Sequence, residues 1–136
     1  MELLLPTTKH LKTAPNGSTD KAVWEALDYL RSRLHWNGSK IAKALRVPVS
    51  TVNFWLAHKK VPVGHPPFAP VAEAVLHLLG IHRSLEAMFS EPTNQTAWLE
   101  TKHPELGVVP LHKMQESFSG LSFIRQYLDY VRGRGA

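Results

Sequence analysis

The chain has 136 residues, enough for one domain or two small ones, and its hydrophobic and charged fractions of 43% and 20% exclude disorder of the whole chain. It has no cysteine, which excludes a disulfide framework and thiolate metal sites and is typical of a reducing cytoplasm. The apolar residues 1–6 are too few for a signal peptide or a membrane span. We therefore expect a cytoplasmic protein with no membrane contact.

The positive charge is concentrated in the first half of the chain. Residues 1–67 hold ten Lys and Arg against four Asp and Glu, whereas residues 68–136 hold six against seven. Nucleic acid is the usual partner of a small basic domain, although a solvated positive face gives the same count.

The first segment, residues 1–19, is predicted to be a flexible arm, because its later part is polar and contains Pro, Asn and Gly in sequence. Thr19 or Asp20 is expected to cap a helix that ends near Leu34. Apolar residues recur there every three or four positions, which predicts one buried stripe. The stripe consists of Val23, Trp24, Leu27, Leu30 and Leu34.

Two short helices are predicted next, over residues 40–45 and 49–58, with Ser39 as the N-cap of the first. The spacing of their apolar residues resembles a helix-turn-helix, in which small Ala42 permits a close crossing and Val47 fills the turn. The residues that set this spacing are Ile41, Ala42, Leu45, Val47, Val52, Trp55 and Leu56. Residues 20–61 are therefore predicted to form a helix-turn-helix domain.

The opposite face of the second short helix is free to enter a DNA major groove. Asn53 is suited to adenine, and Val49 or Phe54 to a thymine methyl group. The predicted DNA-binding residues are Ser39, Lys40, Val49, Ser50, Thr51, Asn53, Phe54, His58, Lys59 and Lys60. A three-helix bundle that binds no DNA uses the same packing, and Arg46 and Pro48 stand where Gly and a Ser or Thr cap are usual.

A Pro-rich connector is predicted over residues 62–70, since residues 61–70 contain four prolines and a glycine. A helix is expected from 71 to 89, bent at Gly80, where its apolar stripe keeps its phase. That stripe consists of Val71, Ala74, Val75, Leu78, Leu79, Leu85, Met88 and Phe89.

Three further helical segments are expected before the C-terminus. Thr93 is predicted to cap the first, with Ala97, Trp98 and Thr101 facing inward. Helix resumes at Pro110, and the last helix spans 121–131. Its apolar residues Leu121, Ile124, Leu128 and Val131 are spaced for burial, which leaves Arg125, Gln126, Asp129 and Arg132 outward and Tyr127 and Tyr130 near the edge.

The C-terminal half also carries an ordered set of short motifs. Leu85-x-x-Met88-Phe89 is followed by Ala97-Trp98-Leu99, by Leu106-Gly107, by Pro110-Leu111, and by Gly120-Leu-Ser-Phe-Ile124. This run resembles the toxin-binding domain of the Xre/MbcA/ParS antitoxin family. A helix-turn-helix in front of that domain is also the family arrangement, so the likeness covers residues 20–136.

The resemblance implies an all-α fold, with an N-terminal helix-turn-helix bundle joined to a C-terminal helical toxin-binding domain over residues 71–136. Family members are antitoxins of type II toxin–antitoxin pairs. They bind RES-domain toxins, which consume NAD, and their C-terminal end covers or enters the active-site cleft of the toxin. They are usually homodimers, and many repress their own operon by binding operator DNA.

The basic end of the chain is therefore expected to contact a toxin. The predicted toxin-binding residues are Arg125, Tyr127, Tyr130, Arg132, Gly133, Arg134, Gly135 and Ala136. Two alternatives stay open: a frayed basic end without a partner, and a stand-alone helix-turn-helix regulator whose C-terminal half serves dimerisation.

An enzyme is not expected from this sequence. None of the eight histidines has metal-ligand spacing; His77 and His82 lie about 140° apart around a helix. The chain has no His-Glu-x-x-His motif, no glycine-rich phosphate loop and no Gly-x-Ser-x-Gly motif. We therefore predict no catalytic residue, no metal and no cofactor.

Overall fold

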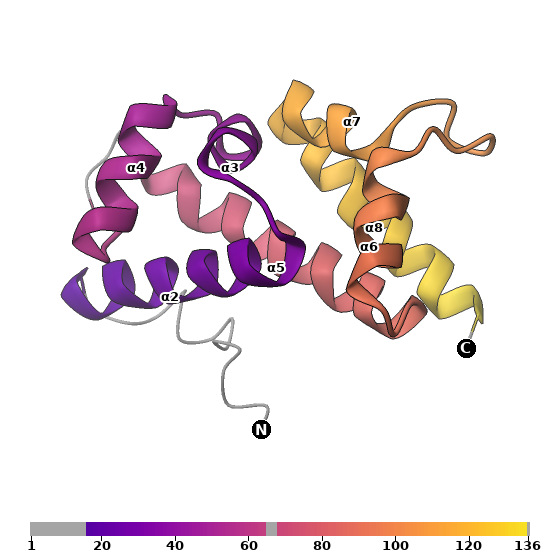
Figure 1. Cartoon of the computed structure of the whole chain (residues 1–136), viewed down its shortest axis with the longest axis horizontal. Helices are drawn as coiled ribbons and strands as arrows, with labels where there is room; N and C mark the ends of the chain where they lie inside the picture. Colours follow the sequence, from indigo (N-terminus) through magenta and orange to yellow (C-terminus); the bar gives the residue numbers. More distant parts are fainter. Residues whose placement is uncertain (1–15, 65–67, 136) are drawn as a thin grey trace. The chain divides into compact units, whose positions relative to one another are not determined.

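The computed structural model describes residues 16–64 and 68–135, whose regular elements are all helices (Figure 1). No strand occurs in these ranges, so the predicted all-α fold class is confirmed. None of the helices in them is both long enough and apolar enough to span a membrane. Most of the predicted N-terminal arm, residues 1–15, lies outside the described residues.

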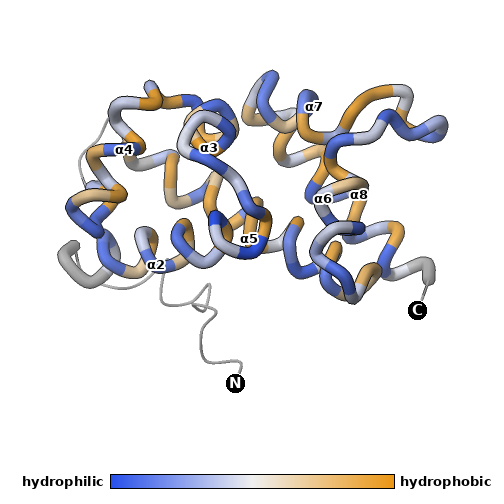
Figure 2. Tube along the Cα trace, viewed as in Figure 1, coloured by the Kyte–Doolittle hydropathy of each residue, from blue (hydrophilic) through white to orange (hydrophobic). Residues whose placement is uncertain are grey.

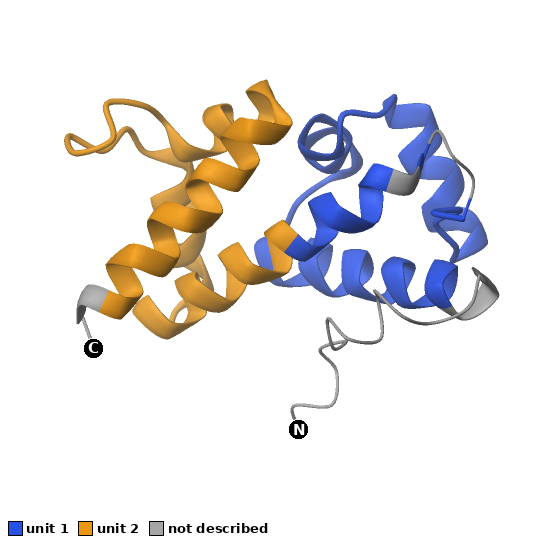
Figure 3. Cartoon of the chain, turned by 180° about the vertical axis from the view of Figure 1, so that it is seen from behind, with its two compact units in different colours: residues 1–76 blue, residues 77–136 orange. Residues whose placement is uncertain are grey.

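Two compact units make up the chain, residues 1–76 and residues 77–136 (Figure 3). Helix α5 (Ala69–Met88) contributes residues to both units, because the division follows Leu76. The described residues of the Pro-rich stretch 62–70 belong to unit 1.

Unit 1 begins with helix α2 (Asn16–Leu34). The helix ends where the sequence predicted, but it starts earlier than the expected cap at Thr19 or Asp20. The apolar period marks only the part of a helix that packs, so it does not locate a first turn outside the core. The predicted stripe is buried except for Trp24, which is half-buried at its edge.

Helices α3 (Gly38–Leu45) and α4 (Val49–His58) pack on each other as the helix-turn-helix prediction required (Figure 1). The cap of α3 is Asn37 and not Ser39, since the Asn37 side chain accepts a 2.9 Å hydrogen bond from the Lys40 backbone N–H. The inward residues Ile41, Ala42, Leu45, Val52 and Trp55 are buried, while Leu56 is only half-buried. Hydrophobic and hydrophilic positions alternate along these helices (Figure 2).

Three helices of unit 1 end on a left-handed residue that is not glycine. These residues are His35, Arg46 and Lys59, with φ values of 56°, 63° and 55°. At the end of α3, the Val47 N–H donates to the Ala42 carbonyl at 3.0 Å and the Arg46 N–H to the Lys43 carbonyl at 3.3 Å. This Schellman pattern satisfies carbonyls that the helix leaves free, but it places an L-residue where glycine fits better.

Unit 2 contains the last part of α5 with α6 (Pro92–Glu100), α7 (Pro110–Glu116) and α8 (Phe118–Gly135). Helix α6 begins at Pro92 after Glu91, so the predicted cap at Thr93 is wrong. Ala97 and Thr101 are exposed, contrary to prediction. Gln95 and Leu99 are buried instead, because the Gln95 amide donates to the Phe89 carbonyl at 2.9 Å and fixes the rotation of α6.

Helix α8 extends beyond the predicted span 121–131 at both ends. Leu121, Ile124 and Leu128 are buried as predicted, and Ser117 caps the helix by accepting a 2.9 Å hydrogen bond from the Gly120 N–H. Helices α7 and α8 approach closely at Gly120, where a Cβ would overlap the Lys113 carbonyl oxygen.

Candidate functional site

Helix α4 presents an uncharged outer face in unit 1. Val52 and Trp55 fix its buried side, and with about 100° between successive residues the centre of the opposite side falls on Ser50 and Ala57. The predicted readers Val49, Ser50, Asn53 and Phe54 are exposed, and Thr51 is half-buried beside them. The structure therefore brings these predicted residues together on one accessible surface.

The N-terminus of α3 lies beside this face. The Asn53 Oδ1 atom is 2.9 Å from the position of a Cβ built on Gly38, and a Val49 methyl carbon is 3.8 Å from it. Ser39 is exposed and Lys40 half-exposed in the same first turn. The free N–H groups at a helix start attract phosphate, and Lys40 adds a positive charge there.

The chain segment that forms α3 and α4 is rich in cations and has no acid. Residues 38–60 contain five Lys and Arg and neither Asp nor Glu. Arg46 ends α3 in the turn before α4, Lys59 ends α4, and both are left-handed and exposed. A non-glycine residue in this conformation costs about 1–2 kcal/mol, so folding alone favours glycine at either position.

In unit 2, the predicted toxin-binding residues do not form a single surface. Arg125 was predicted to face outward, but its side chain is only 30% exposed. It lies over Gly80 of α5, where any Cβ would overlap the guanidinium, and its Nε is 3.5 Å from the Asp129 carboxylate. Arg132 is also 3.5 Å from Asp129, which accepts a 3.2 Å hydrogen bond from the buried Ser84 hydroxyl. These residues fasten α8 to α5.

Tyr127 lies on another side of α8. Its hydroxyl donates to the Glu105 carboxylate, and its ring lies 6.4 Å from the Trp98 ring. Trp98 also stacks on His103 at 4.6 Å, and the His103 Nε2–H donates to the Trp98 carbonyl at 2.7 Å. The cluster holds the loop after α6 against α8. A hollow of about 310 Å³ lies beside this cluster. The hollow is lined with Phe89, Asn94, Ala97, Trp98, Thr101 and His103.

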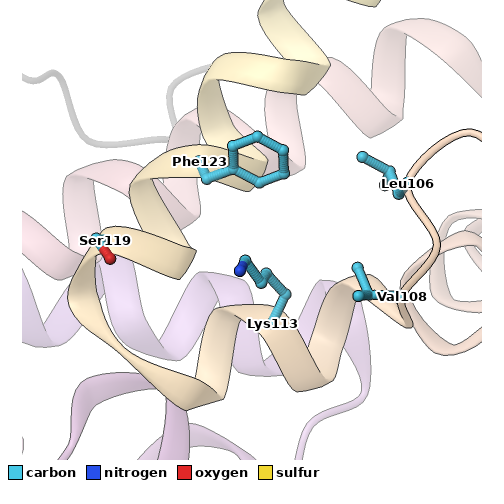
Figure 4. Close-up of a pocket in the computed structure, with 5 residues that line it drawn as sticks. All are labelled: Leu106, Val108, Lys113, Ser119 and Phe123. Carbon is cyan, nitrogen blue, oxygen red and sulfur yellow. The ribbon is translucent and has the colours of Figure 1, made fainter.

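An exposed aromatic surface near the start of α8 escaped the sequence prediction. Phe118 and Phe123 are 40% and 45% exposed. Phe123 borders a hollow of about 400 Å³ between the loop and helices α7 and α8, as Figure 4 shows. The hollow is lined with Leu106, Val108, Lys113, Ser119 and Phe123. Phe123 lies outside the spacing of Leu121, Ile124 and Leu128, and that mismatch was the available signal.

The remaining predicted tail residues are partly outside the description. Tyr130 is 60% exposed and Gly133 is exposed. The side chain of Arg134 and all of Ala136 lie outside the described residues, and for Gly135 only its place at the end of α8 is described. Among the described residues, no three His, Asp or Glu side chains are grouped to hold a metal ion.

The comparison with protein families agrees with this geometry. Residues 84–134 match the family described as the antitoxin Xre/MbcA/ParS C-terminal toxin-binding domain. No curated protein matches the chain. The matched range contains the Tyr127 cluster, the Phe123 hollow and the described part of the tail. Residues 84–134 of this chain thus match an Xre/MbcA/ParS-type toxin-binding domain.

Proposed function

We propose that this protein is an antitoxin that binds a RES-domain toxin, covers the toxin's active-site cleft with the C-terminal end of α8, and thereby stops the toxin from consuming NAD. The antitoxin acts as a homodimer in the cytoplasm. The link to a RES-domain toxin rests on the family resemblance of the Trp98-Leu99 and Pro110-Leu111 motifs.

The exposed aromatic surface on α8 is the observation that carries the proposal. Phe123, Leu106 and Val108 leave apolar area open within the matched domain, and Lys113 places a cation 5.8 Å from the Phe123 ring centre. Interface centres are typically apolar and aromatic with charges at the rim, so this surface suits a protein partner. Phe123 and the C-terminal end belong to the same helix, α8, so a toxin bound at Phe123 can also contact that end.

Co-expression with a RES-domain toxin from the same genome tests the proposal. We expect the antitoxin to restore growth and the cellular NAD level. Phe123→Ala removes the apolar contact and is expected to weaken the purified complex about tenfold, the effect of losing a moderate interface anchor. Gln126→Ala is the matched control, because Gln126 is exposed on the same helix and its described hydrogen bond is a local one to Ser122 at 3.2 Å.

Deletion of residues 133–136 separates binding from inhibition. The shortened chain is expected to keep the complex but to let NAD consumption resume, because only the end of α8 blocks the cleft. A deletion that inhibits as well as the full chain contradicts occlusion by the tail. Failure of the full chain to bind or inhibit the RES-domain toxin contradicts the whole proposal.

We also propose that unit 1 binds operator DNA and represses the operon of the antitoxin. Residues 38–60, which include the uncharged α4 face, contain five cations and no acid, and this supports the second activity. Binding to a DNA duplex should weaken steeply as salt rises, since each phosphate contact releases counterions. Absence of binding at low salt favours the bundle without DNA contact.

A further inference from the structure

We propose that the α4 face reads the methyl groups of thymine, so that the preferred DNA site carries A·T pairs where Val49 and Phe54 enter the major groove. This inference rests on the proposed DNA binding and adds a sequence preference to it. Thymine is the only one of the four unmodified bases with a methyl group in the major groove.

The geometry of α4 separates the two apolar contacts. Val49 and Phe54 are 46% and 60% exposed and lie about 140° apart around the helix, one at each edge of the outer face. Ser50 and Ala57, which are small, occupy the centre between them. Small central residues permit α4 to approach the base edges, and the two larger side chains can then reach different base pairs.

The chemistry of the face favours A·T over G·C. Arg and Lys, which read guanine most often, are missing from helix α4. Asn53, a side chain suited to adenine, lies next to Val49 beside Gly38. A single A·T pair offers the adenine edge to Asn53 and the thymine methyl to Val49.

Phe54 is held in place before any partner arrives. Its ring stacks on His58 with 3.9 Å between centroids, and the His58 Nδ1–H donates to the Phe54 carbonyl at 2.8 Å. A side chain that is already ordered loses less entropy when it binds. The exposed ring is therefore prepared for a contact at a defined position.

DNA fits this face better than a second protein does. The two apolar side chains are separated by the polar Ser50 and Asn53, so they do not form the continuous apolar centre of a protein interface. Five cations and no acid within residues 38–60 complement a phosphate backbone.

Replacement of thymidine by deoxyuridine tests the inference, because it removes only the methyl group. The full chain first selects sites from a duplex pool randomised over two helical turns, and the best-bound duplex is then remade with deoxyuridine. We expect binding to weaken about fourfold for each contacted methyl, the effect of one apolar carbon returned to water. Phe54→Ala should lose part of this sensitivity, whereas Phe54→Leu, which remains apolar, should keep it.

The outcomes distinguish thymine reading from operator binding. Equal binding to both duplexes overturns thymine reading and leaves operator binding intact. No binding to any duplex at low salt overturns both. Full deoxyuridine sensitivity in both Val49→Ala and Phe54→Ala also overturns the inference, as does a Phe54→Ala change in oligomeric state with the sensitivity unchanged. Melting curves of the variants should match the parent, since both side chains are exposed.

Discussion

Replacement of Arg46 by glycine is expected to change stability and DNA affinity in opposite directions. Arg46 is left-handed at φ 63°, and this conformation costs a non-glycine residue about 1–2 kcal/mol. Glycine removes that cost but adds about 0.4–1 kcal/mol of unfolded-state entropy. We therefore expect Arg46→Gly to raise the free energy of unfolding of unit 1 by roughly 0.5–1 kcal/mol.

The same substitution is expected to weaken DNA binding. The logarithm of the binding constant falls linearly with the logarithm of the salt concentration. Loss of one phosphate contact should reduce the steepness of this line by about 1. Lys59→Gly should behave in the same way, because Lys59 is left-handed at the other end of α4. His35→Gly is the control: it relieves the same backbone conformation at a residue that is not among the predicted DNA-binding residues, so it should stabilise unit 1 with the salt slope unchanged.

Two measurements check these variants. Denaturant unfolding followed by tryptophan fluorescence reports mainly on unit 1, which contains Trp24 and the buried Trp36 and Trp55, whereas only Trp98 lies in unit 2. Fluorescence anisotropy with a labelled duplex over a range of salt gives the slope. If Arg46→Gly lowers the free energy of unfolding, the left-handed backbone of Arg46 does not cost stability. If the salt slope is unchanged in both Arg46→Gly and Lys59→Gly, these two side chains do not contact phosphates.

Further substitutions test the packing of both units. Gly120→Ala should destabilise unit 2, because overpacking against the Lys113 carbonyl costs about 1–3 kcal/mol and exceeds the helix gain of about 0.5–1 kcal/mol. Gly133→Ala in the same helix meets no atom within 4 Å and should stabilise it, as thermal unfolding of the two variants will show. Asn37→Ala removes the cap of α3 and should cost unit 1 about 1 kcal/mol in denaturant unfolding; an unchanged midpoint contradicts the cap.

The sequence predicted helices and buried stripes well because both depend on local periodicity. Leu121, Ile124 and Leu128 are buried as their spacing required, and so are Val52 and Trp55. The caps were less certain because several polar residues occur near each helix start. Asn37 and Ser39 are both good caps, and the choice depends on where the backbone turns, which periodicity does not specify.

The candidate site in unit 2 was harder to predict because its contacts join distant segments. Arg125 borders the buried stripe of α8, and only the missing side chain at Gly80 makes room for it to pack inward. Phe123 borders a hollow only because the loop with Leu106 and Val108 lies beside it. No local sequence pattern predicts the conformation of that loop. The exposed binding faces could therefore be identified only from the packed structure, whereas the core could be predicted from the sequence.

Both proposed binding surfaces contain an exposed phenylalanine. Phe54, Phe118 and Phe123 are 60%, 40% and 45% exposed, and full burial of such a ring contributes about 1.5–3 kcal/mol. A single exposed apolar residue is common in proteins and requires no explanation. Here Phe54 stacks on His58 in a chain segment, residues 38–60, that holds five cations and no acid, and Phe123 borders a hollow within the matched toxin-binding range. Because the neighbours of the two rings differ, we infer that they serve chemically different partners: DNA at Phe54 and a toxin at Phe123.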